Sequence, residues 1–458
     1  MSDYFERAHA AVSYSSLFEL RGTVTDVAGL VIEGNGPLVP VGSHVTIRRG
    51  NEVIDAQVVG FRHDKVLLMP FAELHGVSPG ASIVATGASS AVPASAGLLG
   101  RTINALGEPI DGRPLPPGGD LVPLYRSPPN RVRRARISAA FDLGVRSMNT
   151  FLTLGMGQRV GIMAGSGVGK STLLGMIAKH SSSDVNVIGL VGERGREVRE
   201  FIERDLGPEG MKRSVVVVAT GNESALLRIR AAFMATAIAE YFRDQGKRVV
   251  LMIDSITRLA MAQREVGLAI GEPPSTRGYT PSVFAMLPKL LERAGTSEGA
   301  GSITGLYTVL VEGDDMNEPV ADATRGILDG HIVLSRRLAQ RGQYPAIDVL
   351  QSVSRVMSDL VSDEMLALAS QGRETLSTYQ EAEDLITIGA YKPGQNSRVD
   401  RAIELYEPLI GFLKQKSGER ATLQDSWRDF ASIMVPKPAT PPPKQPQRVA
   451  PVAQGGNT

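Results

Sequence analysis

Residues 158–180 read QRVGIMAGSGVGKSTLLGMIAKH, which is an apolar run, a glycine-rich turn and a segment with helical spacing. The apolar run at 158–163 predicts a buried strand. Glycines allow the turn to curl until its backbone N–H groups converge on an anion, and the helix dipole adds to that attraction. A glycine-rich surface turn with a free lysine is the alternative. The strand–loop–helix order favours a phosphate-binding P-loop, with Ala164 where the first glycine usually stands.

This loop predicts binding of ATP with Mg²⁺. Lys170 is expected to bridge the β- and γ-phosphates, and the Ser171 hydroxyl is expected to ligate the metal. The residues expected to hold the nucleotide are Gly165, Ser166, Gly167, Val168, Gly169, Lys170, Ser171 and Thr172.

A second acidic group is needed beside the metal, and Asp254 ends the buried run RVVLMI at 248–253. A buried acid is costly unless it has a partner or a task, so we expect Asp254 to hold the hydration shell of Mg²⁺. Capping of the next helix is a second possible role for the same side chain.

The residue after Asp254 is Ser255, where many P-loop ATPases carry a glutamate that activates water. Glu193 is the best replacement, because it follows the apolar run at 186–191. Ligands of parallel sheets lie at the carboxyl ends of the strands, and Lys170, Asp254 and Glu193 all fall at such ends. Gly192 and Gly195 bracket Glu193, which favours a tight turn that presents its side chain over a simple helix cap.

The composition excludes several classes of protein. The chain has 458 residues, a formal net charge of +1 and no cysteine. A thiol nucleophile, a disulfide scaffold and a Cys-ligated zinc site are therefore excluded. The six histidines are scattered without metal-ligand spacing. We expect no signal peptide at the N-terminus and no transmembrane helix.

Changes in residue composition and pattern along the chain predict five segments. Short β-branched runs with turn residues predict a β-barrel, whereas alternating strands and helices predict a parallel, doubly wound α/β sheet. The strands of that sheet are expected at 158–163, 186–191, 214–219, 248–253, 303–311 and 331–334. The expected segments are an arm at 1–18, the barrel at 19–95, the nucleotide-binding domain at 96–372, a helical domain at 373–435 and a disordered proline-rich tail at 436–458.

The motifs together resemble a known family. GSGVGKS, GERGREV, LMIDSITR, YPAIDVLQSVSRV and GRTINALGEPIDG resemble the hexameric ATPases related to the rotary ATP synthase catalytic subunit. The longer stretches around them, including MAQREVGLAIGEPPSTRGYTPSVFAMLPKLLERAG, are similar to the protein-export ATPases of bacterial flagella and type III secretion systems. The resemblance covers roughly residues 20–435 and implies a RecA-like P-loop core between an N-terminal β-barrel and a C-terminal helical domain.

The resemblance also implies roles for single residues. Glu193 matches the catalytic glutamate, and Arg194 and Arg258 are expected near the γ-phosphate. Tyr344 matches the aromatic residue that stacks on adenine; a core tyrosine is the alternative. Arg355 matches the arginine finger, which reaches the nucleotide of a neighbouring subunit and stabilises the transferring phosphoryl group.

The implied assembly is a homo-hexamer with a central pore, faced by the loop at 269–282. The implied partners are a stator-like negative regulator at the N-terminus, a central stalk-like protein, the export gate and chaperone–substrate complexes. The implied location is the cytoplasm, peripheral to the inner-membrane export apparatus. The implied function is ATP hydrolysis that energises flagellar protein export by unloading substrates and chaperones.

Three alternatives remain at this point. A virulence-type injectisome ATPase has the same motifs, and a rotary ion-pumping subunit fits the longer stretches less well. A hexameric RNA helicase needs a basic, aromatic N-terminal sheet, but the only aromatic residues within 20–90 are Phe61 and Phe71. The arginines at 131, 133, 134 and 136 are the one feature that favours RNA, and a solvated linker explains them better. No nucleic acid partner is therefore expected.

Overall fold

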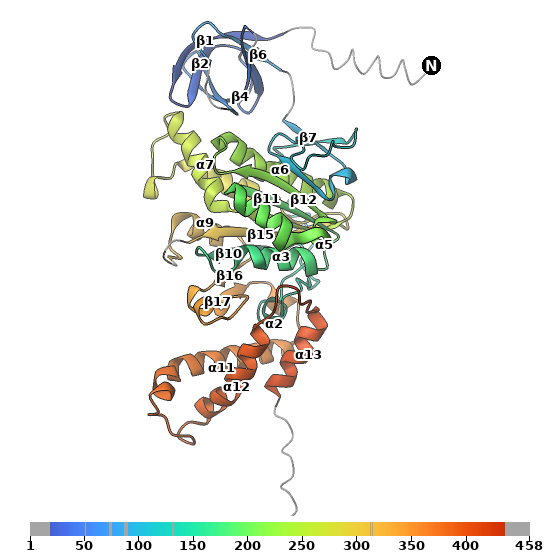
Figure 1. Ribbon diagram of the computed structural model, residues 1–458, viewed down its shortest axis with the longest axis vertical. Helices are drawn as coiled ribbons and strands as arrows, with labels where there is room; N and C mark the ends of the chain where they lie inside the picture. The colour runs from blue at the N-terminus through green and yellow to red at the C-terminus, as the bar shows by residue number, and fades with distance from the viewer. Residues whose placement is uncertain are drawn as a thin grey trace, which may run out of the picture.

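The fold is taken from a computed structural model, which describes residues 19–50, 52–72, 76–86, 90–130, 132–311, 313 and 315–435. The predicted arm at 1–18 and the predicted tail at 436–458 lie outside the described residues. Figure 1 shows a barrel, a sheet covered by helices and a group of helices, arranged in that order along the long axis. The predicted fold class, a P-loop parallel-sheet core between a barrel and a helical region, is confirmed.

Six strands close the N-terminal barrel in the order β1-β2-β5-β4-β3-β6. They are β1 (Arg21–Ala28), β2 (Val31–Asn35), β3 (His44–Arg49), β4 (Glu52–Arg62), β5 (Lys65–Pro70) and β6 (Ser82–Ala85). Inward-facing aliphatic side chains such as Val45, Ile47 and Ile83 fill the barrel. The next strand, β7 (Ala91–Ala94), pairs with β9 (Asp120–Pro123) instead of joining the barrel, although the predicted barrel extends to residue 95.

The central sheet has nine strands in the order β17-β16-β10-β15-β13-β11-β12-β8, with β14 paired to β15 off this path. The bounds are β8 (Arg101–Asn104), β10 (Arg159–Ala164), β11 (Val185–Glu193), β12 (Ser214–Thr220), β13 (Arg248–Asp254), β14 (Gly295–Thr296), β15 (Ser302–Leu310), β16 (Gly330–Leu334) and β17 (Ile347–Ser354). The six predicted strands are therefore present. The pattern missed three strands: β8, because RTIN is short and half polar, β14, because it has only 2 residues, and β17, because buried residues are interspersed with exposed ones.

Helices cover both faces of the sheet, as a doubly wound sheet requires. Alternate residues of one strand point to opposite faces, so Val249 and Leu251 belong to one core, whereas Val250 and Met252 belong to the other. The sheet departs from the predicted parallel form at two places: β17 runs antiparallel to β16 at one edge, and the two-residue β14 runs antiparallel to β15.

The helices flanking the sheet follow the strands in alternation. They are α2 (Arg146–Phe151), α3 (Lys170–His180), α4 (Gly195–Glu200), the π-helix η2 (Phe201–Leu206), α5 (Gly207–Met211), α6 (Ala225–Asp244), α7 (Ile256–Ala269), α8 (Pro281–Leu291), α9 (Pro319–Ile327) and α10 (Arg336–Gln340). Short 3₁₀ turns are η1 (Ala96–Leu98), η3 (Thr276–Gly278) and η5 (Met357–Asp359). The helical segment expected around 223–245 is α6.

The C-terminal region is helical, as predicted. It consists of α11 (Asp363–Thr387), α12 (Ser397–Leu413) and α13 (Leu423–Met434). The boundary expected at residue 373 falls inside α11. Phe430 of α13 packs edge-to-face on Phe151 of α2 with ring centroids 4.8 Å apart, which joins these helices to the core of the nucleotide-binding sheet.

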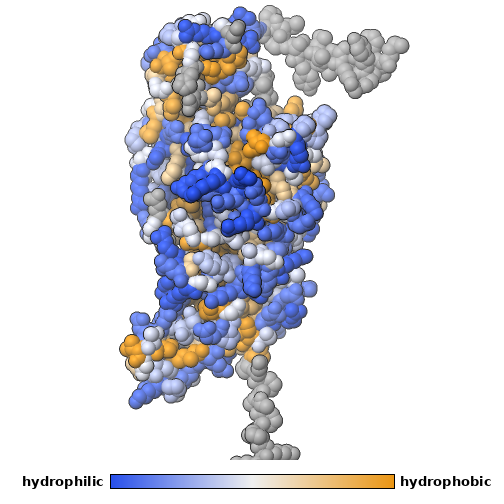
Figure 2. Space-filling model, in the orientation of Figure 1, coloured by the Kyte–Doolittle hydropathy of each residue, from blue (hydrophilic) through white to orange (hydrophobic). Residues whose placement is uncertain are grey.

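Exposed apolar side chains gather at both ends of the molecule, over the barrel and near the free end of α11 and α12 (Figure 2). Strongly exposed apolar side chains at these two ends include Leu38 and Val41 of the barrel and Leu385 and Ile388 of the helical region. Within the described residues, no helix is long and apolar enough to span a bilayer.

Candidate functional site

The glycine-rich loop connects β10 to α3, and Lys170 is the first residue of that helix. Gly169 has a φ of 89° at the N-cap position, a left-handed conformation that side chains disfavour. Gly165 and Val168 are buried, whereas Ser166 and Gly167 are exposed at the tip. The loop is therefore a turn at the carboxyl edge of the sheet that opens onto the N-terminus of an 11-residue helix, as anion binding requires.

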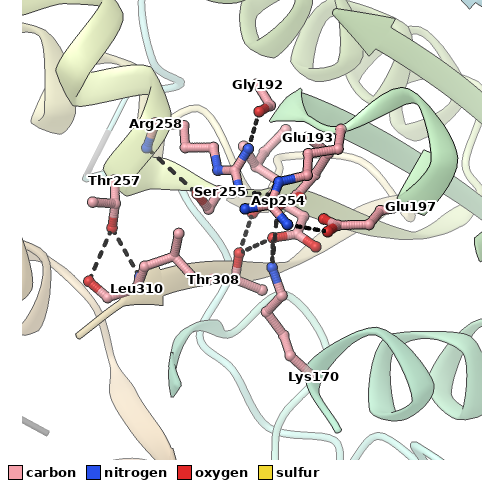
Figure 3. Close-up of polar contacts among 12 residues, drawn as sticks. Lys170, Gly192, Glu193, Glu197, Asp254, Ser255, Thr257, Arg258, Thr308 and Leu310 are labelled. Carbon is pink, nitrogen blue, oxygen red and sulfur yellow. Dashed lines mark hydrogen bonds and ion pairs between the residues drawn. The ribbon is translucent and has the colours of Figure 1, made fainter. Parts of the chain in front are cut away.

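Two acids from neighbouring strands converge on Lys170 (Figure 3). Asp254 is the last residue of β13 and lies beside Leu190 of β11. Glu193 follows Leu190 by three residues, at the end of β11. The Lys170 ammonium donates to Asp254 Oδ1 and lies 3.3 Å from Glu193 Oε1. The side chains of Glu193 and Asp254 are 9% and 4% exposed, so this cation is shared by two buried acids.

Arg258 provides a second cation for Glu193. It lies in the first turn of α7, with a terminal nitrogen 3.3 Å from Glu193 Oε2 and another donating to the Gly192 carbonyl. Gly192 has a φ of +75°, and a Cβ there would lie 2.9 Å from Arg258 Cδ. Glycine at this position therefore allows Arg258 to lie against the strand end beside Glu193.

Burial and charge act in opposition within this cluster. Burial raises the pKa of Glu193, and Lys170 and Arg258 partly offset that rise. Burial alone would lower the pKa of Lys170, but the carboxylates of Asp254 and Glu193 outweigh it and raise that pKa. A hydrogen bond with Glu193 lowers the pKa of Glu197, a residue of α4 that sequence analysis did not select.

Neither acid serves as a helix cap. The cap of α7 is Ser255, whose side chain accepts from the Arg258 N–H. Arg194 occupies the N-cap position of α4 without a side-chain cap bond. The capping alternatives for Asp254 and Glu193 are therefore not observed, and both carboxylates face the P-loop lysine.

Arg194 is linked to Glu193 through Glu197, which pairs with Arg194 and hydrogen-bonds to Glu193. Its side chain is 67% exposed, and it pairs with Glu197 at 3.3 Å. Of the two arginines expected near the γ-phosphate, Arg258 contacts Glu193 directly and Arg194 turns toward its own helix.

Thr308 of β15 was missed by sequence analysis. Its hydroxyl donates to Asp254 Oδ1 at 2.7 Å, and the residue is fully buried. The segment GLYTVL reads as an apolar strand in which one threonine is unremarkable. Only the pairing of β13 with β15 brings it to Asp254.

Tyr344 borders a pocket of about 520 Å³ beside the P-loop. A Cβ on Gly169 would lie 3.4 Å from the Tyr344 ring, and the side chain is 48% exposed, so it is not a core tyrosine. Thr172, Leu173 and Met176 of α3 form one wall, and the segment 414–417 after α12 forms another. The pocket has the position and the aromatic face that a nucleotide base requires.

Arg355 lies at the amino-terminal end of the parallel strands, whereas the P-loop lies at their carboxyl end. In the register of the sheet, Ser354 is beside Gly330 at the start of β16, whereas Ala164 is beside Leu334 at its end. Four residues of strand, ~13 Å, separate these levels. The Arg355 side chain is exposed and donates to the Arg325 carbonyl. It therefore does not join Lys170 in the same chain.

The oxygen donors at the loop suit Mg²⁺. No group of three or more His, Asp or Glu that could hold a metal occurs among the described residues. Mg²⁺ in nucleotide sites takes only one or two protein oxygens and keeps waters and phosphates. The buried carboxylate of Asp254 and the Ser171 hydroxyl beside Lys170 match that donor set.

A P-loop at the carboxyl edge of a parallel sheet, with two buried acids facing its lysine, defines a nucleotide-binding domain of the ATPase type. The sequence matches the ATP synthase alpha/beta family nucleotide-binding domain over 144–354 and its beta-barrel domain over 24–87. Residues 361–432 match the C-terminal domain of the type III secretion ATPase EscN.

The similarity to individual proteins extends over nearly the whole chain. The flagellum-specific ATP synthase of Bacillus subtilis is 56% identical over 92% of this chain and 97% of that protein. The type 3 secretion system ATPase of Xanthomonas euvesicatoria is 48% identical over 90% of this chain and 93% of that protein. The assembled EscN ATPase of enteropathogenic E. coli superposes with a TM-score of 0.86 at 42% identity, over 90% of this chain and 100% of that one. The chain belongs to the family of flagellum-specific and type III secretion ATPases.

Proposed function

We propose that this chain hydrolyses ATP with Glu193 as the group that orients and polarises the attacking water. The observation that carries the proposal is the convergence of Glu193 and Asp254 on Lys170 at one strand edge. When nucleotide binds, Lys170 moves its contacts from the acids to the phosphates. Glu193 then has Arg258 as its remaining cation and becomes free to accept a proton from water.

The nucleotide lies across the P-loop in this proposal. Backbone N–H groups from Gly165 to Thr172 surround the phosphates, and Tyr344 stacks on the base. Ser171 and Asp254 hold Mg²⁺, Asp254 partly through water. The metal supplies neutralisation of phosphate charge when it is bound.

A ring completes the site. Arg355 is exposed at the sheet edge away from its own P-loop, which supports its action on the nucleotide of a neighbouring subunit. A contact between two different faces closes into a cyclic oligomer, here a homo-hexamer. The loop at 269–282 then faces the central pore. The assembled form of EscN supports this arrangement.

The ring energises protein export through the flagellar type III apparatus, unloading substrates and chaperones at the export gate. It acts in the cytoplasm, peripheral to the inner membrane. EscN has been solved with its central stalk EscO, which supports a stalk-like partner here. A stator-like negative regulator is proposed to bind at the N-terminus.

An injectisome ATPase is the second candidate, because relatives from secretion systems reach 48% identity. The flagellar assignment is preferred because the flagellum-specific relative reaches 56%. The helicase alternative has little support: Phe71, which follows β5, is buried in the core shared with the central sheet, and Phe61 is 46% exposed. Arg134 donates to the Glu292 and Ala294 carbonyls and so anchors the linker to the core, and Arg131 lies outside the described residues.

Complementation tests this function. The chain is expressed in a Bacillus subtilis strain that lacks its flagellum-specific ATP synthase, and swimming is scored in soft agar. In parallel, it is expressed in Xanthomonas euvesicatoria lacking its type 3 secretion ATPase, and effector secretion is scored. Restored swimming alone supports the flagellar assignment, whereas restored secretion alone favours the injectisome. Lys170→Ala is the inactive control in both strains.

A further inference from the structure

Asp254 has a neutral hydrogen-bond donor as well as a cation. The Thr308 hydroxyl lies 2.7 Å from Asp254 Oδ1 and 3.3 Å from the Ile253 carbonyl. A hydroxyl has a single proton, so the shorter contact to the carboxylate is the one that uses it. Thr308 is fully buried in β15, directly beside the end of β13 (Figure 3).

The same carboxylate oxygen also accepts from Lys170. Under the proposed function, Lys170 is needed at the phosphates, so its contact with Asp254 is lost in the nucleotide-bound state. A buried carboxylate without a donor is costly and free to rotate. Among the described residues, Thr308 is the donor that remains, because both hydrogen-bond contacts of its hydroxyl are to β13 and not to the nucleotide loop.

The end of β15, which carries Thr308, is hydrogen-bonded to the start of α7. The Leu310 N–H donates to Thr257 Oγ1 at 2.8 Å, and Thr257 is in the first turn of α7. That helix begins at its cap, Ser255, the residue after Asp254. The end of β15 therefore bonds to α7, and α7 follows Asp254. This bond holds the Thr308 hydroxyl beside the Asp254 carboxylate.

We propose that Thr308 is a positioning residue that keeps the Asp254 carboxylate in one orientation for the Mg²⁺ hydration shell after Lys170 has moved to the phosphates. This proposal rests on the proposed ATPase function. It predicts that the Thr308 hydroxyl affects the contribution of Mg²⁺ to nucleotide binding and leaves metal-free binding unchanged.

The test measures binding of a fluorescent ATP analogue, with and without Mg²⁺, in four proteins. Thr308→Val keeps the side-chain shape and removes the hydroxyl, and Thr308→Ser restores it. Thr304→Val is the matched control, because Thr304 is 1% exposed on the same strand and accepts from the Gly157 N–H at 3.0 Å, away from Asp254.

In Thr308→Val, metal-free affinity should match wild type, and the gain in affinity on adding Mg²⁺ should shrink about tenfold, the effect of one lost hydrogen bond to a charged group. Thr308→Ser and Thr304→Val should keep the gain. A full Mg²⁺ gain in Thr308→Val, or an equal loss in Thr304→Val, overturns the proposal. If Thr308→Val does not fold, Thr308→Ala replaces it with the same expected outcomes. A wild-type chain without any Mg²⁺ gain or hydrolysis contradicts the proposed function instead.

Discussion

The ammonium nitrogen of Lys170 lies 3.3 Å from Glu193 Oε1, although the two residues come from a helix start and a strand end. Asp254 accepts from the same nitrogen. This three-residue cluster explains how two buried acids are tolerated without nucleotide. Under the proposed function, phosphate and the two acids compete for one lysine, so nucleotide binding is expected to release the carboxylates for chemistry.

Removing the lysine should destabilise the protein without nucleotide. Lys170→Met leaves Glu193 and Asp254 buried without this cation, at a cost of about 3 kcal/mol. Because the pKa of Glu193 is raised, its charged form lowers stability at pH values above that pKa. The loss should therefore be largest near neutral pH and shrink as the pH falls through the pKa of Glu193.

Thermal unfolding at neutral and mildly acidic pH measures this effect. Lys179→Met, in the last turn of the same helix, is the control for loss of a lysine alone. An equal loss of stability at every pH contradicts the view that Lys170 neutralises a titrating acid.

Arg258 should determine the pH below which kcat falls, because its charge acts on the pKa of Glu193. Its charge lowers the pKa of Glu193, against the larger effect of burial. Arg258→Gln removes that charge, so the pKa of Glu193 rises, and the water-activating carboxylate form is lost at a higher pH. The acid limb of the pH–kcat profile should move to higher pH. Arg264→Gln, on the same helix but over the Tyr279 ring, should leave that limb in place.

Tyr344 should act on base binding. Tyr344→Ala should raise the KM for ATP about tenfold, the size of one lost stacking contact, with little change in kcat. Tyr344→Phe keeps the aromatic face and should stay near wild type. Steady-state kinetics of both variants decide the point: a fall in kcat at unchanged KM would place Tyr344 outside the base pocket.

Arg355 should act between subunits. Arg355→Ala rings should hydrolyse ATP poorly, and so should Lys170→Ala rings. In mixed rings, some interfaces combine an intact P-loop with an intact Arg355 from the neighbour, so activity should exceed the sum of the separate proteins. Hydrolysis is measured across mixing ratios after co-assembly. Activity that never exceeds that sum argues for a role of Arg355 within its own chain.

The sequence predicted the parts of the site that depend on strand ends. Lys170, Glu193 and Asp254 each follow an apolar run, and parallel pairing brings such ends together. The contact between Thr308 and Asp254 was not predictable, because it depends on which strands are neighbours. β17 also escaped prediction, and its antiparallel course is what places Arg355 at the far edge. Arg194 precedes α4 at its N-cap, whereas Arg258 lies inside the first turn of α7, and residue periodicity does not determine which of them contacts Glu193.

The central claim is that Glu193 activates the water in the P-loop site, and Glu193→Gln tests it most directly. The amide keeps the size of the side chain and cannot accept the proton. Binding of the fluorescent ATP analogue with Mg²⁺ and assembly into rings should remain close to wild type, while kcat falls by at least ~10²-fold, the usual contribution of a general base. A Glu193→Gln protein that binds, assembles and turns over ATP at near wild-type rate would contradict the account.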